Sequence, residues 1–173
     1  MRRRLLAAAL ASLLAAAPAA VRAADAVDGP KAIFQDELLE RLVGRWTITR
    51  KIRGTEVRNR ATARWVLHHQ FLELRLEDAA KPPAYEAIVL IGYSHADQKY
   101  VIHWCDTFGG KFSSRGFGKR AGDAIAFEFP YEEGPFYNTF TFHPESGSWT
   151  SLMENSGEGG RRALFAEDTY RRP

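Results

Sequence analysis

A predicted hairpin in residues 85–110 decides the fold of this chain. It runs Tyr85-Glu86-Ala87-Ile88-Val89-Leu90-Ile91-Gly92-Tyr93, turns through residues 94–98, and returns as Lys99-Tyr100-Val101-Ile102-His103-Trp104-Cys105-Asp106. The first arm is apolar and β-branched on both faces, which predicts a strand that is buried on both sides. In the second arm, Tyr100, Ile102 and Trp104 share one face. The stretch therefore predicts an antiparallel sheet over a covered core.

The same alternation extends to both sides of this hairpin. Upstream, Trp46, Ile48 and Arg50 share one face of a strand that starts after Gly44. Alternation and turn residues predict the remaining strands near residues 56–68, 70–77, 111–118, 124–130, 136–143, 148–155 and 161–171. About ten short strands joined by short turns favour an all-β, antiparallel up-and-down barrel or a sandwich. A closed barrel is preferred, because no terminal strand looks blunted and closure removes exposed edges.

A short helix is predicted in front of the first strand. Phe34, Leu38 and Leu42 recur every four residues, which gives one apolar stripe on a helix over residues 33–42. Pro30 suits the start of this helix and Gly44 suits its end. We expect the helix to act as a lid or plug that packs on the sheet.

The N-terminus has the pattern of a secretory signal peptide. Met1-Arg2-Arg3-Arg4 is followed by an apolar run over residues 5–17 and by small residues up to Ala24. Residues 1–23 are therefore predicted to be a signal peptide, with Val21-x-Ala23 as the best cleavage match and Ala24-x-Ala26 as the second. An uncleaved anchor is the alternative interpretation, although the run is short for a membrane span.

This signal divides the chain into three parts. Residues 1–23 are the signal, residues 24–32 are a polar and flexible lead-in, and residues 33–173 are one barrel domain. The mature chain offers no run of about 18 apolar residues, so no membrane span is expected in it. The expected location is periplasmic or secreted.

The charge of the mature chain argues against nucleic acid as a partner. The whole chain has 24 Lys+Arg against 21 Asp+Glu and a formal net charge of +3. Four arginines leave with the signal and no acidic residue does, so the net charge falls by four units to −1. The basic composition thus belongs mostly to the targeting segment.

Short motifs across the chain resemble a known family. Leu42-Val43-Gly44-Arg45-Trp46, at the opening of the first strand, resembles the Gly-x-Trp signature of the calycin barrels, which include lipocalins and fatty-acid-binding proteins. Together with Ile91-Gly92-Tyr93, Lys99-Tyr100-Val101, Trp104-x-Asp106 and Glu167-x-x-Tyr170-Arg171, it resembles domain-of-unknown-function family 1579, which is assigned to the calycin superfamily. The match covers roughly residues 38–171, with Ser94 where members often carry Asp. The resemblance implies a calycin-like barrel and no established activity.

The resemblance also implies a contact at one end of the barrel. Calycins stack a late arginine on the indole of their Gly-x-Trp motif, which corresponds to Trp46 here. The predicted partner is Arg171, with Arg172 as the alternative one residue out and on the opposite face.

The histidines and the single cysteine do not form a cofactor or metal site in the sequence. The haem-binding relatives that this chain loosely resembles, the nitrobindins, carry their proximal histidine near the C-terminus, whereas the last histidine here is His143. His68 and His69 are neighbours on a predicted strand and should point to opposite faces. His103 and Cys105 share a face but have no third ligand, and Cys105 is expected to be a buried, inert thiol. We therefore predict no cofactor and no metal.

Catalytic groups are equally sparse. Ser151 and the Ser113-Ser114 pair have no Gly-x-Ser-x-Gly context, and the glycine-rich residues 156–160 precede a strand where a phosphate cradle would need a helix. Asp106 and Glu154 could serve as acid or base, but a buried carboxylate bonded to arginine or backbone is the preferred interpretation. No catalytic residue is assigned.

One arginine differs from the others. Arg58, Arg60 and Arg64 share a face of the second strand that is best interpreted as solvated. Arg50 instead shares its face with Trp46, Ile48 and Ile52, so it should point into the barrel. An inward arginine needs a partner. That partner is either the acidic end of a ligand, or Glu154 or Asp106 within the chain.

These features favour an exported barrel that binds a small, partly apolar molecule with an acidic end. The candidate ligand-binding residues are Trp46, Ile48, Arg50, Trp104, Asp106, Phe127 and Phe140. A homodimer is possible. One alternative function is a structural or partner-binding barrel whose lumen is filled by bulky residues such as Phe129 and Phe142. The other is a cofactor-free enzyme that uses carboxylates in the lumen.

Overall fold

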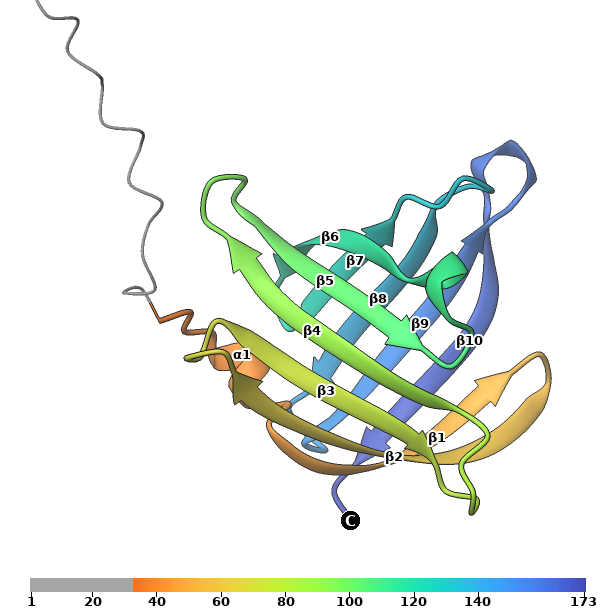
Figure 1. Cartoon of the computed structure of the whole chain (residues 1–173), viewed down its shortest axis with the longest axis horizontal. Coiled ribbons are helices and arrows are strands. Elements are labelled where there is room, and N and C mark those ends of the chain that lie inside the picture. Colours follow the sequence, from red (N-terminus) through yellow and green to blue (C-terminus); the bar gives the residue numbers. More distant parts are fainter. Residues whose placement is uncertain (1–32) are drawn as a thin grey trace, which may run out of the picture. The chain divides into compact units, whose positions relative to one another are not determined.

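Ten antiparallel strands form a closed barrel in the computed structural model, which describes residues 33–173 (Figure 1). The strands are β1 (Gly44–Ile52), β2 (Thr55–Val66), β3 (Phe71–Asp78), β4 (Glu86–Ser94), β5 (Lys99–Asp106), β6 (Ser114–Ala121), β7 (Ala124–Phe129), β8 (Phe136–His143), β9 (Ser148–Ser156) and β10 (Arg162–Arg171). Three short helices accompany them within these residues: α1 (Glu37–Glu40), η1 (Gly110–Phe112) and η2 (Glu158–Gly160). The predicted all-β, ten-stranded antiparallel barrel is confirmed. The predicted signal peptide (1–23) and lead-in (24–32) lie outside the described residues.

The barrel has the simplest possible topology. Each strand pairs with the strand that follows it in the chain, and β10 returns to pair with β1. The closing register sets Thr47 opposite Arg171 and Ile52 opposite Ala166. Because every strand has two neighbours, no sheet edge is left to pair with another chain.

The bounds of β2 and β6 differ most from the expectation. β2 ends at Val66, because Leu67, His68 and His69 have φ angles of 51°, 53° and 65° and form a turn. The prediction that His68 and His69 lie on a strand was therefore wrong. β6 begins at Ser114 and not at residue 111, because the residues before it form η1.

The helix before β1 is a single turn. Asp36 caps it, and its Oδ1 accepts hydrogen bonds of 2.9 Å from the backbone N–H groups of both Leu38 and Leu39. This cap starts the helix at Glu37, so Phe34 and Leu42 flank the helix and are not part of it. The predicted helix over residues 33–42 was too long, but its three apolar residues are all buried, as a plug requires.

The outer face of the central hairpin is more exposed than the sequence suggested. Ala87, Val89 and Ile91 of β4 are buried inside the barrel, whereas Ile88 between them is 40% exposed. Cys105 of β5 is also exposed, with its Sγ 3.2 Å from the hydroxyl of Ser113. The predictions of a strand buried on both sides and of a buried thiol were therefore wrong. A barrel covers only its inner face, and nothing among the described residues packs over this part of its outside.

The core fills the end of the barrel that carries α1, here called the helix end. Leu38, Leu39 and Leu42 are at most 1% exposed and pack with Trp46 and Trp149 from the strands. These side chains are packed against one another at the density of a protein interior. Within the described residues, no helix has the length and apolar character needed to cross a membrane.

Candidate ligand-binding site

A belt of buried polar side chains lines one wall of the lumen. It crosses five strands that are neighbours in the barrel, namely β2, β1, β10, β9 and β8. Each strand contributes one residue, and none is more than 7% exposed: Asn59, Arg50, Asp168, Ser151 and Asn138. The opposite wall is apolar and includes Leu74, Val89 and Ile102. The lumen is therefore amphipathic, with the buried polar belt on one side and mostly apolar side chains on the other.

An ion pair forms the centre of this polar belt. Arg50 donates from Nε to Asp168 Oδ1 and from Nη2 to Asp168 Oδ2, each at 2.7 Å, and the two residues are direct cross-strand neighbours. Burial by itself would lower the pKa of Arg50, but the hydrogen bonds and charge of Asp168 outweigh it and raise that pKa. Both side chains are thus charged, two hydrogen bonds join them, and their charges cancel.

The partner of Arg50 within the chain is Asp168, and not Glu154 or Asp106 as considered from the sequence. Glu154 alternates with the buried residues Ser151 and Met153 of β9, so it points out of the barrel and contacts Arg162 at 3.5 Å. This orientation removes Glu154 from the lumen. Asp168 shares the inner face of β10 with Tyr170, which is the signal in the sequence that could have identified it.

Tyr85 links the ion pair to two residues predicted for the site. The guanidinium carbon of Arg50 lies 5.2 Å from the centre of the Tyr85 ring. The Tyr85 hydroxyl donates to Asp106 Oδ2 at 3.3 Å, and Trp104 Nε1 donates to both of these oxygens at 3.3 Å. Burial raises the pKa of Tyr85 to about 12, against the opposing charge of Arg50. Tyr85 therefore remains a hydrogen-bond donor at neutral pH.

Tyr85 was not among the site residues predicted from the sequence. It precedes β4 and shares its alternation with Ala87 and Val89, both of which point inward. The alternation that turns Tyr85 inward could be read from the sequence. Its role was not, because the contact with Arg50 depends on how the barrel closes.

Two polar atoms near the ion pair form no hydrogen bond of good geometry with the residues described, although the hydroxyl of one of them lies near the carboxylate of Asp168. They are Oδ1 of Asn59 and the hydroxyl of Tyr170, on residues that flank Ile48 from its two neighbouring strands. Burial and the charge of Asp168 raise the pKa of Tyr170, so this hydroxyl stays protonated. A buried polar group without a partner costs about 1–3 kcal/mol. Trp149 Nε1 is a third such atom, in the core of the helix end.

Phenylalanine rings lie along the lumen wall. Phe127 lies against the backbone of Gly118, where a Cβ atom would come within 2.5 Å of the ring. Phe129 lies against Gly116 in the same way, with a corresponding distance of 3.0 Å. Phe140 packs edge-on to Phe127 at 6.2 Å and lies 6.4 Å from the ring of Tyr170. The glycines of β6 thus provide room for rings that would otherwise extend into the lumen.

Trp46 belongs to the helix end. The guanidinium of Arg172 lies 3.9 Å from the centre of its indole ring and donates to the carbonyl of Arg41 at 3.2 Å. Gly44 makes this possible, because a Cβ there would lie 2.2 Å from Arg172 Nη1. Arg171 was predicted at this position and is instead exposed, since the alternation along β10 turns it outward.

The predicted site residues therefore fall into three groups. Arg50, Trp104 and Asp106 are brought together through Tyr85. Phe127 and Phe140 form apolar wall beside Tyr170. Trp46 and Ile48 are packed towards the helix end and are at most 2% exposed.

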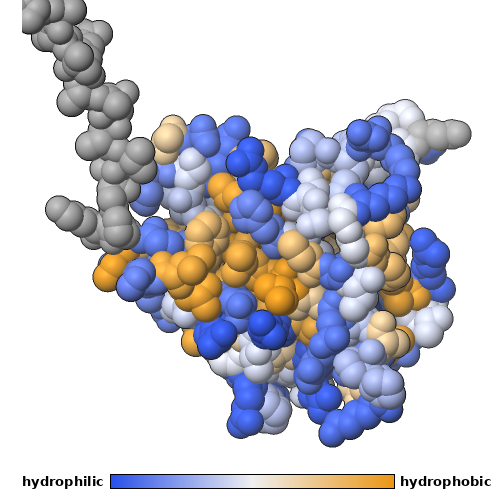
Figure 2. Space-filling model, viewed as in Figure 1, coloured by the Kyte–Doolittle hydropathy of each residue, from blue (hydrophilic) through white to orange (hydrophobic). Residues whose placement is uncertain are grey.

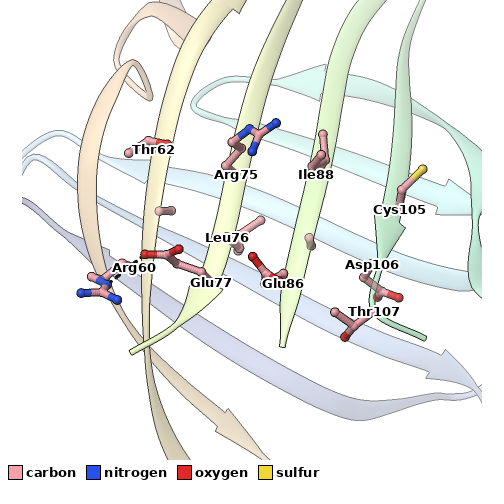
Figure 3. Close-up of a pocket in the computed structure, with 12 residues that line it drawn as sticks. Arg60, Thr62, Arg75, Leu76, Glu77, Glu86, Ile88, Cys105, Asp106 and Thr107 are labelled. Carbon is pink, nitrogen blue, oxygen red and sulfur yellow. Dashed lines mark ion pairs between the residues drawn. The ribbon is translucent and has the colours of Figure 1, made fainter. Parts of the chain in front are cut away.

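Two hollows lie outside the lumen. One, of about 550 Å³, crosses the outer face of β2 to β5 and is lined by residues that include Thr62, Arg75, Ile88 and Cys105 (Figure 3). The other, of about 630 Å³, lies beside the plug and is lined by residues that include Asp36, Tyr100 and Arg120. Residues 33–173 contain no group of three His, Cys, Asp or Glu side chains suited to a metal ion.

Comparisons with known proteins bear on the fold and the family. The sequence model of a family described as "Protein of unknown function (DUF1579)" matches residues 34–172. The crystal structure of Rv2717c from M. tuberculosis is similar in fold, with a TM-score of 0.52 and 10% identity over 81% of this chain and 99% of that chain. A search of curated proteins found no match.

Proposed function

The chain belongs to the DUF1579 family of proteins of unknown function, and we propose that it binds a small amphipathic molecule in the lumen of its barrel. The observation that carries this proposal is the polar belt on β2, β1, β10, β9 and β8, facing an apolar wall. A lumen that serves only as a structural core is most stable when it is apolar, because each buried polar group must be desolvated. A ligand with one polar and one apolar side would match both walls.

The polar end of the ligand is best described as neutral. Asp168 already takes two donors of Arg50, so the pair has no net charge to offer an anion. A buried carboxylate would also be repelled by Asp168. A hydroxyl or amide fits better, because it could accept from Tyr170 and donate to Oδ1 of Asn59. The ligand with an acidic end that was expected from the sequence is therefore replaced by a neutral one, because Arg50 already has a partner within the chain.

A calycin-like origin and export complete the proposal. The stacking of Arg172 on Trp46, at the Gly-x-Trp motif, supports kinship with calycin barrels. The Arg-Arg-Arg start and the apolar run after it support export to the periplasm or beyond. We expect N-terminal sequencing of the soluble protein to find Ala24 or Val27 first. An intact Met1 would contradict export.

Ligand class is tested by displacement of a neutral fluorescent probe. The purified protein is first loaded with N-phenyl-1-naphthylamine, and 1-dodecanol, dodecanamide and sodium dodecanoate are then compared as competitors at pH 8. We expect the alcohol and the amide to displace the probe at concentrations at least about 10-fold lower than the acid, since only the acid must bury a charge beside Asp168. Equal or better displacement by the acid would restore the acidic ligand.

A matched pair of variants locates binding in the lumen. Tyr170→Phe removes the inner hydroxyl, and Tyr137→Phe removes a hydroxyl from the outer face of the same barrel, where the ring packs under Arg162. Losing one neutral hydrogen bond should weaken dodecanol binding about 2- to 10-fold in Tyr170→Phe and leave Tyr137→Phe unchanged. If the wild type binds none of the three compounds and carries no co-purified molecule in native mass spectrometry, the lumen is a filled structural core.

A further inference from the structure

The outer face of β3 to β6 carries an apolar patch that is separate from the lumen. The outer patch comprises Phe71, Ile88, Leu90, Val101 and Phe117, which are partly or largely exposed. Figure 2 shows apolar residues gathered over β3, β4 and β5 on this face. By contrast, the outer face of β2 carries Arg58, Arg60 and Arg64. A contiguous apolar patch on a soluble surface marks an interaction site more often than scattered apolar residues do.

Charges of both signs border the outer patch. Glu73 accepts from Arg64 at 3.0 Å and from Arg75 at 3.3 Å, and Glu77 lies 3.2 Å from Arg60. On the other side of the patch, Lys99 Nζ and the guanidinium of Arg115 lie 5.9 Å and 4.8 Å from the centre of the Phe117 ring, so charges of both signs are present. A nucleic acid or an anionic membrane is recognised by a surface of one sign, so a partner with mixed charges fits better.

We propose that the outer patch is the interface at which a second copy of this chain binds. The described strands close into a barrel without an edge strand, so two copies cannot associate by extending the sheet, and an exposed apolar face is the surface best suited to an interface. Two copies related by a two-fold axis present the same face to each other, which requires that face to be complementary to itself. The register of the strands meets this requirement.

Two rows of outward residues cross the patch side by side. In one row, Arg75, Ile88 and Cys105 are cross-strand neighbours, as Figure 3 shows. The next outward row consists of Glu73, Leu90 and His103. A two-fold axis can run perpendicular to the strands, midway between these two rows. Rotation about this axis places the first row of one copy over the second row of the other copy.

Each contact made in this way joins compatible groups. Arg75 faces Glu73 of the second copy, so opposite charges meet. Ile88 faces Leu90 of the second copy, and both lose contact with water. Cys105 faces His103 of the second copy. One axis thus satisfies the charged pair and the apolar pair together, and every contact occurs twice.

The single cysteine provides a direct probe of this arrangement. The two copies of Cys105 would be offset by two residues along the strands, about 7 Å, between sheets stacked about 10 Å apart. A short thiol-specific bismaleimide spans such a separation. Because no other cysteine exists in the chain, a covalent dimer can arise only through this residue.

The test combines sedimentation with cross-linking of the purified full-length protein. Ile88→Lys places a charge at the centre of the patch, and Leu152→Lys is the matched control, because Leu152 is 37% exposed on the outer face of β9. We expect the wild type and Leu152→Lys to sediment as dimers and to cross-link with bismaleimidoethane. Ile88→Lys should dissociate about 100-fold more readily, since the change occurs twice per interface. Circular dichroism establishes that each variant is folded.

A second pair of variants tests the register. Arg75→Glu sets two carboxylates against each other across the axis and should weaken the dimer about 10-fold or more. Combining it with Glu73→Arg restores opposite charges and should recover dimerisation. A wild type that is monomeric at every concentration overturns the proposal, as does cross-linking of Ile88→Lys equal to that of the control. Recovery that fails in a folded double variant overturns the register. Ligand binding in the lumen can succeed or fail independently of these outcomes.

Discussion

The two ends of the barrel differ in the side chains on their inner faces, although the same strands form both ends. At the helix end, α1 and the residues around it exclude water, and Leu38, Leu42 and Trp46 are at most 2% exposed. Towards the other end, here called the polar end, the inner face carries the Arg50–Asp168 pair and the Tyr85 network. Tyr85 and Asp106 there remain partly exposed. The barrel thus concentrates packing at one end and hydrogen-bonding groups at the other.

The contacts that hold the plug explain this division. Tyr100 donates to Asp36 from the strands, and Trp65 Nε1 donates to Glu40 at 2.5 Å. The ring of Phe34 packs within 5.7 Å of both Trp65 and Tyr93. These contacts satisfy the polar groups of the plug and leave its apolar side to the core. Stability is thus supplied where no ligand is expected, and the polar end is free to carry groups that cost stability.

The largest expected effect is at the polar end. Asp168→Leu leaves the charge of Arg50 buried without its partner, so the free energy of unfolding should fall by about 3–5 kcal/mol. Adding Arg50→Met removes the stranded charge and should recover most of that loss. Urea denaturation of both variants measures the difference. If Asp168→Leu alone is as stable as the wild type, the ion pair is not buried in solution.

A comparable loss at the helix end should leave binding intact. Trp46→Ala opens a cavity beneath α1 and should lower the free energy of unfolding by about 3–5 kcal/mol. Trp46 meets the proposed site only at the ring of Tyr170, with the ring centroids 6.5 Å apart, so the folded fraction should keep most of its affinity for the neutral probe. Denaturation and probe titration on the same preparation give both values. Loss of binding by the folded protein would mean that the two ends are coupled.

Alkaline pH should weaken the barrel through its buried phenols. The pKa of Tyr85 is raised to about 12, and burial also raises those of Tyr100 and Tyr170. The folded state loses these protons at a higher pH than the unfolded state does. Their contribution to the free energy of unfolding is therefore fully present below pH 10 and is lost as the pH rises towards 12. Tyr85 alone should account for about 2–3 kcal/mol over that range.

The variant Tyr85→Phe isolates this contribution. Its unfolding midpoint in urea should decline less steeply than that of the wild type between pH 10 and 11.5. If the unfolding midpoint declines equally in both proteins, the Tyr85 hydroxyl is exposed to water in the folded state.

The smallest effect concerns the stacked arginine. Arg172→Ala removes the cation that lies over Trp46 and should cost about 0.5–2 kcal/mol. Arg171→Ala is the matched control, because its side chain is exposed and its loss should change stability by less than about 0.5 kcal/mol. Thermal denaturation compares the two. A larger effect from Arg171→Ala would support the register first expected from the sequence.

The sequence by itself determined the number of strands, their antiparallel arrangement and, for most strands, which face points inward. The side-chain period of a strand is two, so the buried alternation around Trp46 predicts an inward Arg50 without any knowledge of the fold. The same reasoning predicted an inward Trp104 and Asp106 on β5, and both take part in the Tyr85 network. The family was also recognisable, because its motifs sit at the ends of these strands.

Only the tertiary structure decided what each inward or outward residue meets. Arg50 and Asp168 are separated by 118 residues and become neighbours because β10 closes on β1. The polar belt likewise joins Asn59 to Asn138 across the closing strands, and no local pattern contains that adjacency. Cys105 was misjudged for the same reason, since alternation identifies a face and not what covers it. Local sterics set the period of a strand, whereas contacts across a closed sheet depend on register and closure, which involve the whole chain.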